Sequence, residues 1–129
     1  MNVSMITLGC KVNQYESQAM LEDLCRKGFF ACPAGEKPDI VVINSCTVTA
    51  TGDHKVRQTV RHARRTHPDA VIVLTGRTPQ ALPEESAALQ EADIVLGNTN
   101  RHALCDDILQ FMRTHERVID ITPHENGET

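Results

Sequence analysis

The sequence has no tryptophan, one tyrosine and three phenylalanines among its 129 residues. Aliphatic side chains must therefore fill the core, because the hydrophobic fraction is an ordinary 40%. No apolar run approaches the roughly 20 residues that a transmembrane helix needs, so we expect no membrane association. The formal net charge of −4 argues against a protein that binds nucleic acid non-specifically over its whole surface.

Two further absences concern the cellular compartment. The N-terminus lacks the basic and then apolar pattern of a secretory signal peptide. The five cysteines are odd in number and are not spaced as in a small disulfide-rich scaffold. We therefore expect a cytoplasmic protein whose thiols stay reduced and serve packing, metal binding or redox chemistry.

The clearest strand signal lies within residues 38–46, Pro-Asp-Ile-Val-Val-Ile-Asn-Ser-Cys. A short β-branched run without polar alternation is typical of a strand buried on both faces of a parallel sheet, although a buried helix gives the same pattern. Pro38 before the run and the polar pair after it limit its length and favour the strand. Ligands bind at the carboxyl ends of strands in open α/β sheets, which is where Cys46 falls.

Strand and helix signals alternate along the whole chain. Further strands are predicted at residues 3–8, 70–75 and 94–96, with weaker short ones at 29–32 and 118–121. Helices are predicted from residue 13 to about 27, from a cap at 49 or 51 to about 67, from 83 onward, and from 100 to 113. This pattern predicts an α/β fold: a three-layer α/β/α arrangement around a mostly parallel five-stranded sheet, as in flavodoxin and Rossmann folds. Residues 1–122 would form this domain and 123–129 a polar tail or the start of a linker.

Local signals refine the first and last helices. Asn13 with Glu16 has the spacing of a capping box, which predicts the N-cap of the first helix. Gly28 stands where a helix end favours positive φ. Cys25 on the first helix and Cys105 on the last lie at helical spacing with apolar residues, so both are predicted to be core; Cys32 is assigned to the short edge strand.

Three predicted strands end in comparable triplets. These are Leu8-Gly9-Cys10, Asn44-Ser45-Cys46 and Thr75-Gly76-Arg77. Neighbouring parallel strands lie about 4.8 Å apart, so side chains at their carboxyl ends converge on one small site. Three thiolates there would suit an iron–sulfur cluster, but arginine does not ligate. From spacing alone, Cys10 and Cys46 fit better as small buried hydrophobic residues than as ligands, because free cysteine is commonly buried.

Two longer motifs resemble the N-terminal domain of the radical-SAM methylthiotransferases. They are Gly-Cys-Lys-Val-Asn-Gln-Tyr-Glu-Ser at 9–17 and Val-Ile-Asn-Ser-Cys-Thr-Val-Thr at 42–49; residues 73–76, Gln80 and 96–98 continue the likeness. The sequence Lys-Val-Asn-Gln-Tyr after Cys10 is most similar to that of the branch that adds a methylthio group to C2 of N6-threonylcarbamoyladenosine beside the tRNA anticodon. Sister branches act on isopentenyladenosine or on a ribosomal-protein aspartate.

The resemblance implies that separate domains of one enzyme hold different cofactors. In that family this domain holds an auxiliary 4Fe–4S cluster through three cysteines, of which Cys10 and Cys46 would be two. A following radical-SAM domain holds a second 4Fe–4S cluster and S-adenosylmethionine through Cys-x-x-x-Cys-x-x-Cys, and an RNA-binding domain usually completes the enzyme. Asn13, Gln14 and Asn44 would surround the auxiliary cluster as polar neighbours.

The chain departs from the family pattern in two places. The third cysteine position holds Arg77, and the Cys-x-x-x-Cys-x-x-Cys motif is absent. We therefore expect an excised domain or a truncated relative that has no catalytic activity alone and assembles the auxiliary cluster weakly or not at all.

Other interpretations fit parts of the sequence. Four arginines on the second helix, Arg57, Arg61, Arg64 and Arg65, would meet tRNA phosphates, meet the missing radical-SAM domain, or form only a solvated face. The whole chain also fits a cluster-free α/β docking module for protein or RNA. A flavodoxin-like or response-regulator-like phosphate binder is the third alternative, but the chain lacks the acidic cluster of a phosphoacceptor.

Overall fold

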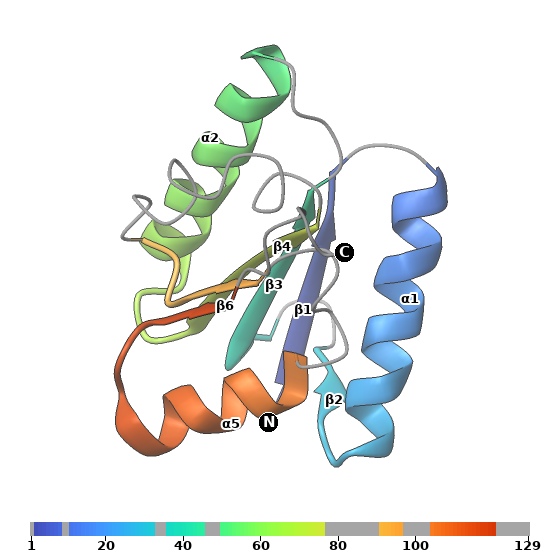
Figure 1. Cartoon of the computed structure of the whole chain (residues 1–129), viewed down its shortest axis with the longest axis vertical. Helices are drawn as coiled ribbons and strands as arrows, with labels where there is room; N and C mark the ends of the chain where they lie inside the picture. Colours follow the sequence, from blue (N-terminus) through green and yellow to red (C-terminus); the bar gives the residue numbers. More distant parts are fainter. Residues whose placement is uncertain are drawn as a thin grey trace, which may run out of the picture.

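The computed structural model describes residues 2–8, 11–32, 36–45, 50–76, 91–96 and 104–120. These ranges contain six strands and three helices (Figure 1). In chain order they are β1 (Asn2–Thr7), α1 (Lys11–Arg26), β2 (Phe30–Ala31), β3 (Ile40–Ser45), α2 (Ala50–Thr66), β4 (Val71–Gly76), β5 (Ile94–Leu96), α5 (Leu104–Thr114) and β6 (Val118–Asp120). No helix within these ranges is long and apolar enough to cross a membrane.

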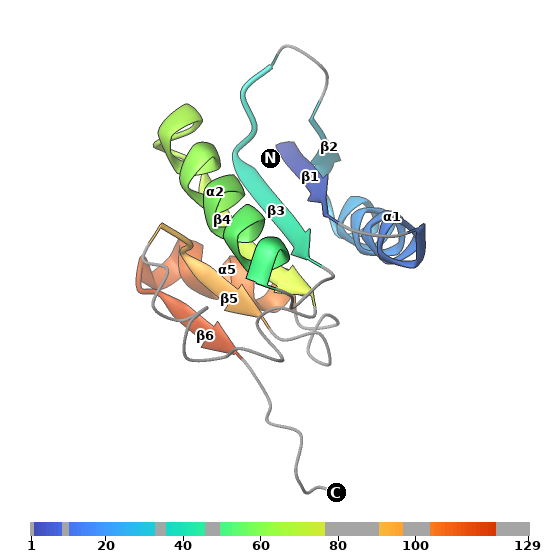
Figure 2. The same ribbon diagram turned by 90° about the horizontal axis from the view of Figure 1, so that it is seen from above.

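One parallel sheet joins all the described strands. Its order is β2-β1-β3-β4-β5-β6, and every pairing between neighbours is parallel. Figure 2 shows α1 and α2 on opposite sides of this sheet. The predicted three-layer α/β/α fold is therefore confirmed, with six strands instead of five. The two weaker strands predicted at 29–32 and 118–121 are both present, as β2 and β6, and together they bring the count to six.

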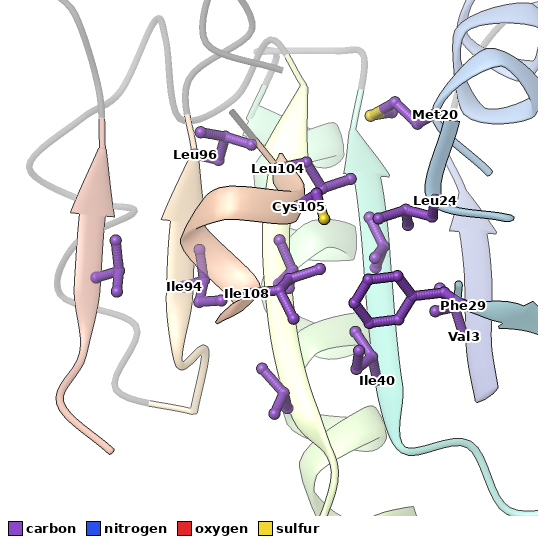
Figure 3. Packing of buried hydrophobic residues seen from close by; sticks show 14 residues of the cluster. Val3, Met20, Leu24, Phe29, Ile40, Ile94, Leu96, Leu104, Cys105 and Ile108 are labelled. Carbon is purple, nitrogen blue, oxygen red and sulfur yellow. The ribbon is translucent and has the colours of Figure 1, made fainter. Parts of the chain in front are cut away.

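The core has two halves, one on each face of the sheet. On one face, Met20 and Leu24 of α1 and Leu104, Cys105 and Ile108 of α5 belong to one buried cluster (Figure 3). On the other face, α2 contributes Val56, Val60 and Ala63 to a second cluster. β3 supplies alternate residues to each half, and all six of its residues are buried. The prediction of a strand covered on both faces is confirmed.

Two local predictions were wrong. α1 begins at Lys11, so Asn13 lies inside the helix and is not its N-cap. Cys25 is exposed, because the buried stripe of α1 passes through Met20 and Leu24, and the residue after Leu24 is turned about 100° around the axis. Gly28 does have positive φ, at 102°. The predicted helix from 83 onward lies outside the described residues.

Cys105 lies in the core, as predicted, with a relative exposure of 4%. Burial raises the pKa of its thiol, which opposes ionisation, while the nearby Lys27 lowers it. Lys27 itself pairs with Asp23 at 3.1 Å, and the hydrogen bond from Lys27 lowers the pKa of the Asp23 carboxyl. Cys105 is thus a packing residue with little thiolate character.

Candidate functional site

The strands β1, β3 and β4 end side by side at one edge of the sheet. Thr7 pairs with Asn44, and Asn44 pairs with Thr75 on the other side. Ser45 pairs with Gly76, so β3 and β4 end level with each other. The Leu8 amide also donates to the Asn44 carbonyl at 2.9 Å, which extends the β1–β3 pairing past the last residue of β1.

This edge contains the point where the strand order reverses. From β1 the chain passes through α1 to β2 on one side, and then returns to β3 on the other side of β1. Such a reversal leaves a crevice outside the carboxyl ends of the two central strands, where ligands of open α/β sheets bind. The order 2-1-3-4-5 is the flavodoxin-like one, for which the reversal falls between β1 and β3.

A group of three polar side chains, of which Ser17 and Asn44 are buried and Thr7 is partly buried, lies beneath this edge. Ser17 of α1 is 4% exposed and its hydroxyl oxygen accepts two hydrogen bonds, from Thr7 Oγ1 at 2.7 Å and Asn44 Nδ2 at 2.9 Å. Ser17 therefore joins α1, β1 and β3 at the reversal. We call Thr7, Ser17 and Asn44 the hydroxyl–amide junction.

A second polar contact joins β3 to β4 at the same edge. The buried Ser45 hydroxyl donates to the Thr75 carbonyl at 2.9 Å. Thr75 Oγ1 is buried and has no hydrogen-bond partner within the described part of the chain. In β3 and β4, polar side chains therefore replace the aliphatic ones only within the last two residues, directly before the segments in which Cys46 and Arg77 stand.

The predicted site residues are only partly visible in this arrangement. Cys10, Cys46 and Arg77 lie outside the described residues, so their convergence stays a prediction. Asn44 is 1% exposed and belongs to the hydroxyl–amide junction. Gln14 is exposed on α1, and Asn13 lies in the first turn of that helix with its side chain outside the description.

Sequence reasoning missed Ser17, Thr7, Ser45 and Thr75. A signal for Ser17 was present, because it falls three residues before Met20 and seven before Leu24, on the inward face of α1. A polar residue at such a position needs a buried partner, and Asn44 supplies one. Among the described side chains, no group of three His, Cys, Asp or Glu residues is placed to hold a metal ion.

The four arginines of α2 differ in their surroundings. Arg61 and Arg65 are exposed, and Arg57 is half-buried. Arg64 is tied to its own chain: its guanidinium donates to the carbonyls of Pro68 and Ala70 and to the Asp93 carboxylate. A contact of these arginines with RNA or with another domain stays a prediction, and Arg64 already has internal partners.

Comparison with known proteins agrees with this fold and these motifs. Residues 2–97 match the family described as "Uncharacterized protein family UPF0004". The chain belongs to the UPF0004 family. The matched span covers β1 through β5, and with them the strand-order reversal and the hydroxyl–amide junction.

Individual UPF0004 relatives have names that refer to tRNA. A "Threonylcarbamoyladenosine tRNA methylthiotransferase MtaB" of Bacillus subtilis is 40% identical over 116 residues, which is 90% of this chain and 26% of that protein. Its namesake from Aquifex aeolicus is 35% identical over 119 residues, 92% of this chain and 29% of that protein. A "tRNA-2-methylthio-N(6)-dimethylallyladenosine synthase" of Pelotomaculum thermopropionicum is 29% identical over 130 residues, 96% of this chain and 29% of that protein. The chain thus spans less than a third of the length of these relatives.

Proposed function

We propose that this chain is the N-terminal domain of a tRNA methylthiotransferase that acts on N6-threonylcarbamoyladenosine. The observation that carries the proposal is the coincidence of two independent features. The cysteine motifs at 9–17 and 42–49 directly follow or include the ends of β1 and β3, and the strand order reverses between those two strands. The names of the relatives supply the substrate class.

In this proposal the domain works as part of a longer enzyme in the cytoplasm. Residues 1–122 form the domain, and residues 123–129 begin a linker to a radical-SAM domain in the same polypeptide. That second domain would supply the radical chemistry with its own 4Fe–4S cluster and S-adenosylmethionine, and tRNA would be the substrate of the whole enzyme. The 129 residues alone would not be catalytic.

Cys10 and Cys46 are the proposed ligands of the auxiliary 4Fe–4S cluster, but the donor set of this chain does not fit that cluster. A guanidinium is always protonated and has no lone pair to donate, so Arg77 cannot take the place of a third thiolate. The described polar neighbours at the edge, Asn44 among them, add no thiolate. We therefore assign no reaction step to a cluster in this chain.

Replacing Arg77 with cysteine is expected to restore cluster binding. After anaerobic reconstitution, iron and sulfide assays should find about four of each per R77C chain, and well below one cluster per unmodified chain, because only R77C supplies three thiolates. Adding Cys46→Ala to R77C should abolish the gain. Adding Cys25→Ala, at an exposed position on α1, should leave it unchanged.

The same iron and sulfide assays distinguish the proposed function from its alternative. A cluster-free docking module is favoured by one observation, the arginine at the third ligand position. If R77C gains no iron, the ligand assignment is wrong and the docking function becomes the better explanation. A full cluster in the unmodified chain would also overturn the assignment, because two thiols and an arginine would then suffice.

A further inference from the structure

The carboxyl-terminal part of α2 and the turn after it form a basic segment in an otherwise acidic chain. Residues 55–67 contain five of the 13 lysines and arginines and no acidic residue: Lys55, Arg57, Arg61, Arg64 and Arg65. The net charge of the whole chain is −4. Positive charge is therefore concentrated on one helix, which is the electrostatic pattern of a nucleic-acid contact rather than of a uniformly charged surface.

This segment borders an open hollow on the surface. The hollow has a volume of about 690 Å³, and the described residues that line it are Gln58, Arg61, His62, Arg64, Arg65 and Glu91. The inward stripe of α2 is buried against the sheet, so the lining side chains point away from the core. Figure 2 shows α2 along the side of the sheet opposite to α1.

The charges around the hollow are unequally compensated. Arg64 forms one wall, and its charge is balanced by the Asp93 carboxylate. Arg61 has only a loose ion pair with Glu91 at 3.8 Å, and its side chain is 57% exposed. Arg65 is exposed, and no described residue pairs with it. Arg61 and Arg65 are four residues apart and so project from the same side of the helix, about 5–6 Å from each other at Cβ.

We propose that this hollow binds the phosphate backbone of RNA through Arg61 and Arg65. Guanidinium groups bind phosphate oxygens in a bidentate manner, so two neighbouring arginines suit a run of phosphates. An acidic protein surface is the rival partner, but protein interfaces normally have an apolar or aromatic centre. Three of the six described lining residues are arginines and one is acidic, which matches the more positive interfaces of nucleic-acid complexes.

The hollow lies far from the strand ends. α2 starts at Ala50, five residues after the end of β3, and runs back toward the start of β4. At 1.5 Å per residue, Arg61 and Arg65 lie about 16 and 22 Å along the axis from the helix start. Phosphate contacts at such a distance position an RNA without reading its bases. The inference rests on the proposed function, since tRNA is then the RNA that would reach both the hollow and the strand ends.

The test measures the affinity of the chain for a fluorescein-labelled RNA hairpin by anisotropy, from 20 to 200 mM KCl. R61E/R65E should weaken binding at least tenfold at the lowest salt and reduce the salt slope by about 2, because two phosphate contacts are lost. The matched control is R26E/R113E, which changes the net charge by the same amount at exposed positions on α1 and α5, on the other face of the sheet. It should stay within threefold of the unmodified chain.

Two results would overturn the inference. Equal weakening by both double variants would assign the effect to total charge, and unchanged binding by R61E/R65E would leave an acidic protein as the better partner. Circular dichroism and thermal melting check that both variants fold, and R61Q/R65Q should show an intermediate loss. The iron assay on R77C does not depend on these arginines, so the proposed function and this inference fail or succeed separately.

Discussion

Replacing Arg64 with methionine is expected to destabilise the chain by about 3 kcal/mol. The Arg64 guanidinium joins three segments. Nη1 donates to the carbonyls of Pro68 at 2.9 Å and Ala70 at 3.1 Å. Nε and Nη2 donate to the Glu91 carbonyl at 3.2 and 3.1 Å, and Nη2 also pairs with Asp93. Asp93 Oδ2 in turn accepts from the Ile72 amide at 3.0 Å. Without the cation, the partly buried Asp93 carboxylate loses its ion-pair partner and three carbonyls lose a donor, at the point where α2, β4 and β5 meet.

Urea denaturation of R64M and the unmodified chain measures this loss directly. Arg61→Met is the control on the same helix, since its exposed ion pair at 3.8 Å is worth less than about 1 kcal/mol. Arg64→Lys should fall between the two, because an ammonium keeps the charge but not the planar fork. If R64M and R61M are equally stable, the internal contacts of Arg64 contribute nothing beyond a surface charge.

Replacing Ser17 with alanine is expected to cost about 2 kcal/mol. The Ser17 hydroxyl oxygen is the shared acceptor of Thr7 Oγ1 and Asn44 Nδ2, and Ser17 and Asn44 are 4% and 1% exposed. Alanine removes that acceptor from two donors, of which the Asn44 amide is buried and the Thr7 hydroxyl is partly buried. The cost is one of desolvation, because the volume of the side chain hardly changes.

A double-mutant cycle with Thr7→Val isolates the contact. The coupling between S17A and T7V should be at least about 0.5 kcal/mol, because both remove the same hydrogen bond. Thr59→Ala is the control, since the Thr59 hydroxyl donates to the Lys55 carbonyl of its own helix. This variant should lower the free energy of unfolding by only about 0.5 kcal/mol. If the losses in the free energy of unfolding from S17A and T7V simply add, the two side chains do not share a stabilising hydrogen bond.

Much of the fold was predictable because it depends on local patterns. The unbroken β-branched run at 40–43 predicted a strand buried on both faces, and the structure confirms it. The strand at 94–96 was predicted with its observed bounds. Gly28 was predicted at positive φ from its place after a helix. Cys25 and Asn13 were predicted wrongly, because exposure and helix start depend on how α1 packs against the sheet.

The site was predictable only as a set of motifs. Cys10, Cys46 and Arg77 each follow a strand in the sequence, and their meeting at one site stays a prediction. Ser17 was not singled out, because its meaning depends on Asn44, which is 27 residues away in the chain. Arg64 is one of four similar arginines in the sequence of α2, and only its contacts with Glu91 and Asp93 set it apart.

The sequence by itself determined the strand and helix segments, the strand buried on both faces at 40–43, and the two cysteine motifs. These are properties of neighbouring residues, which share one helix turn or one strand. Only the tertiary structure decided the strand order, with its reversal between β1 and β3, and the partners of Ser17 and Arg64. Those depend on contacts between segments far apart in the chain, and such contacts form only when the sheet assembles.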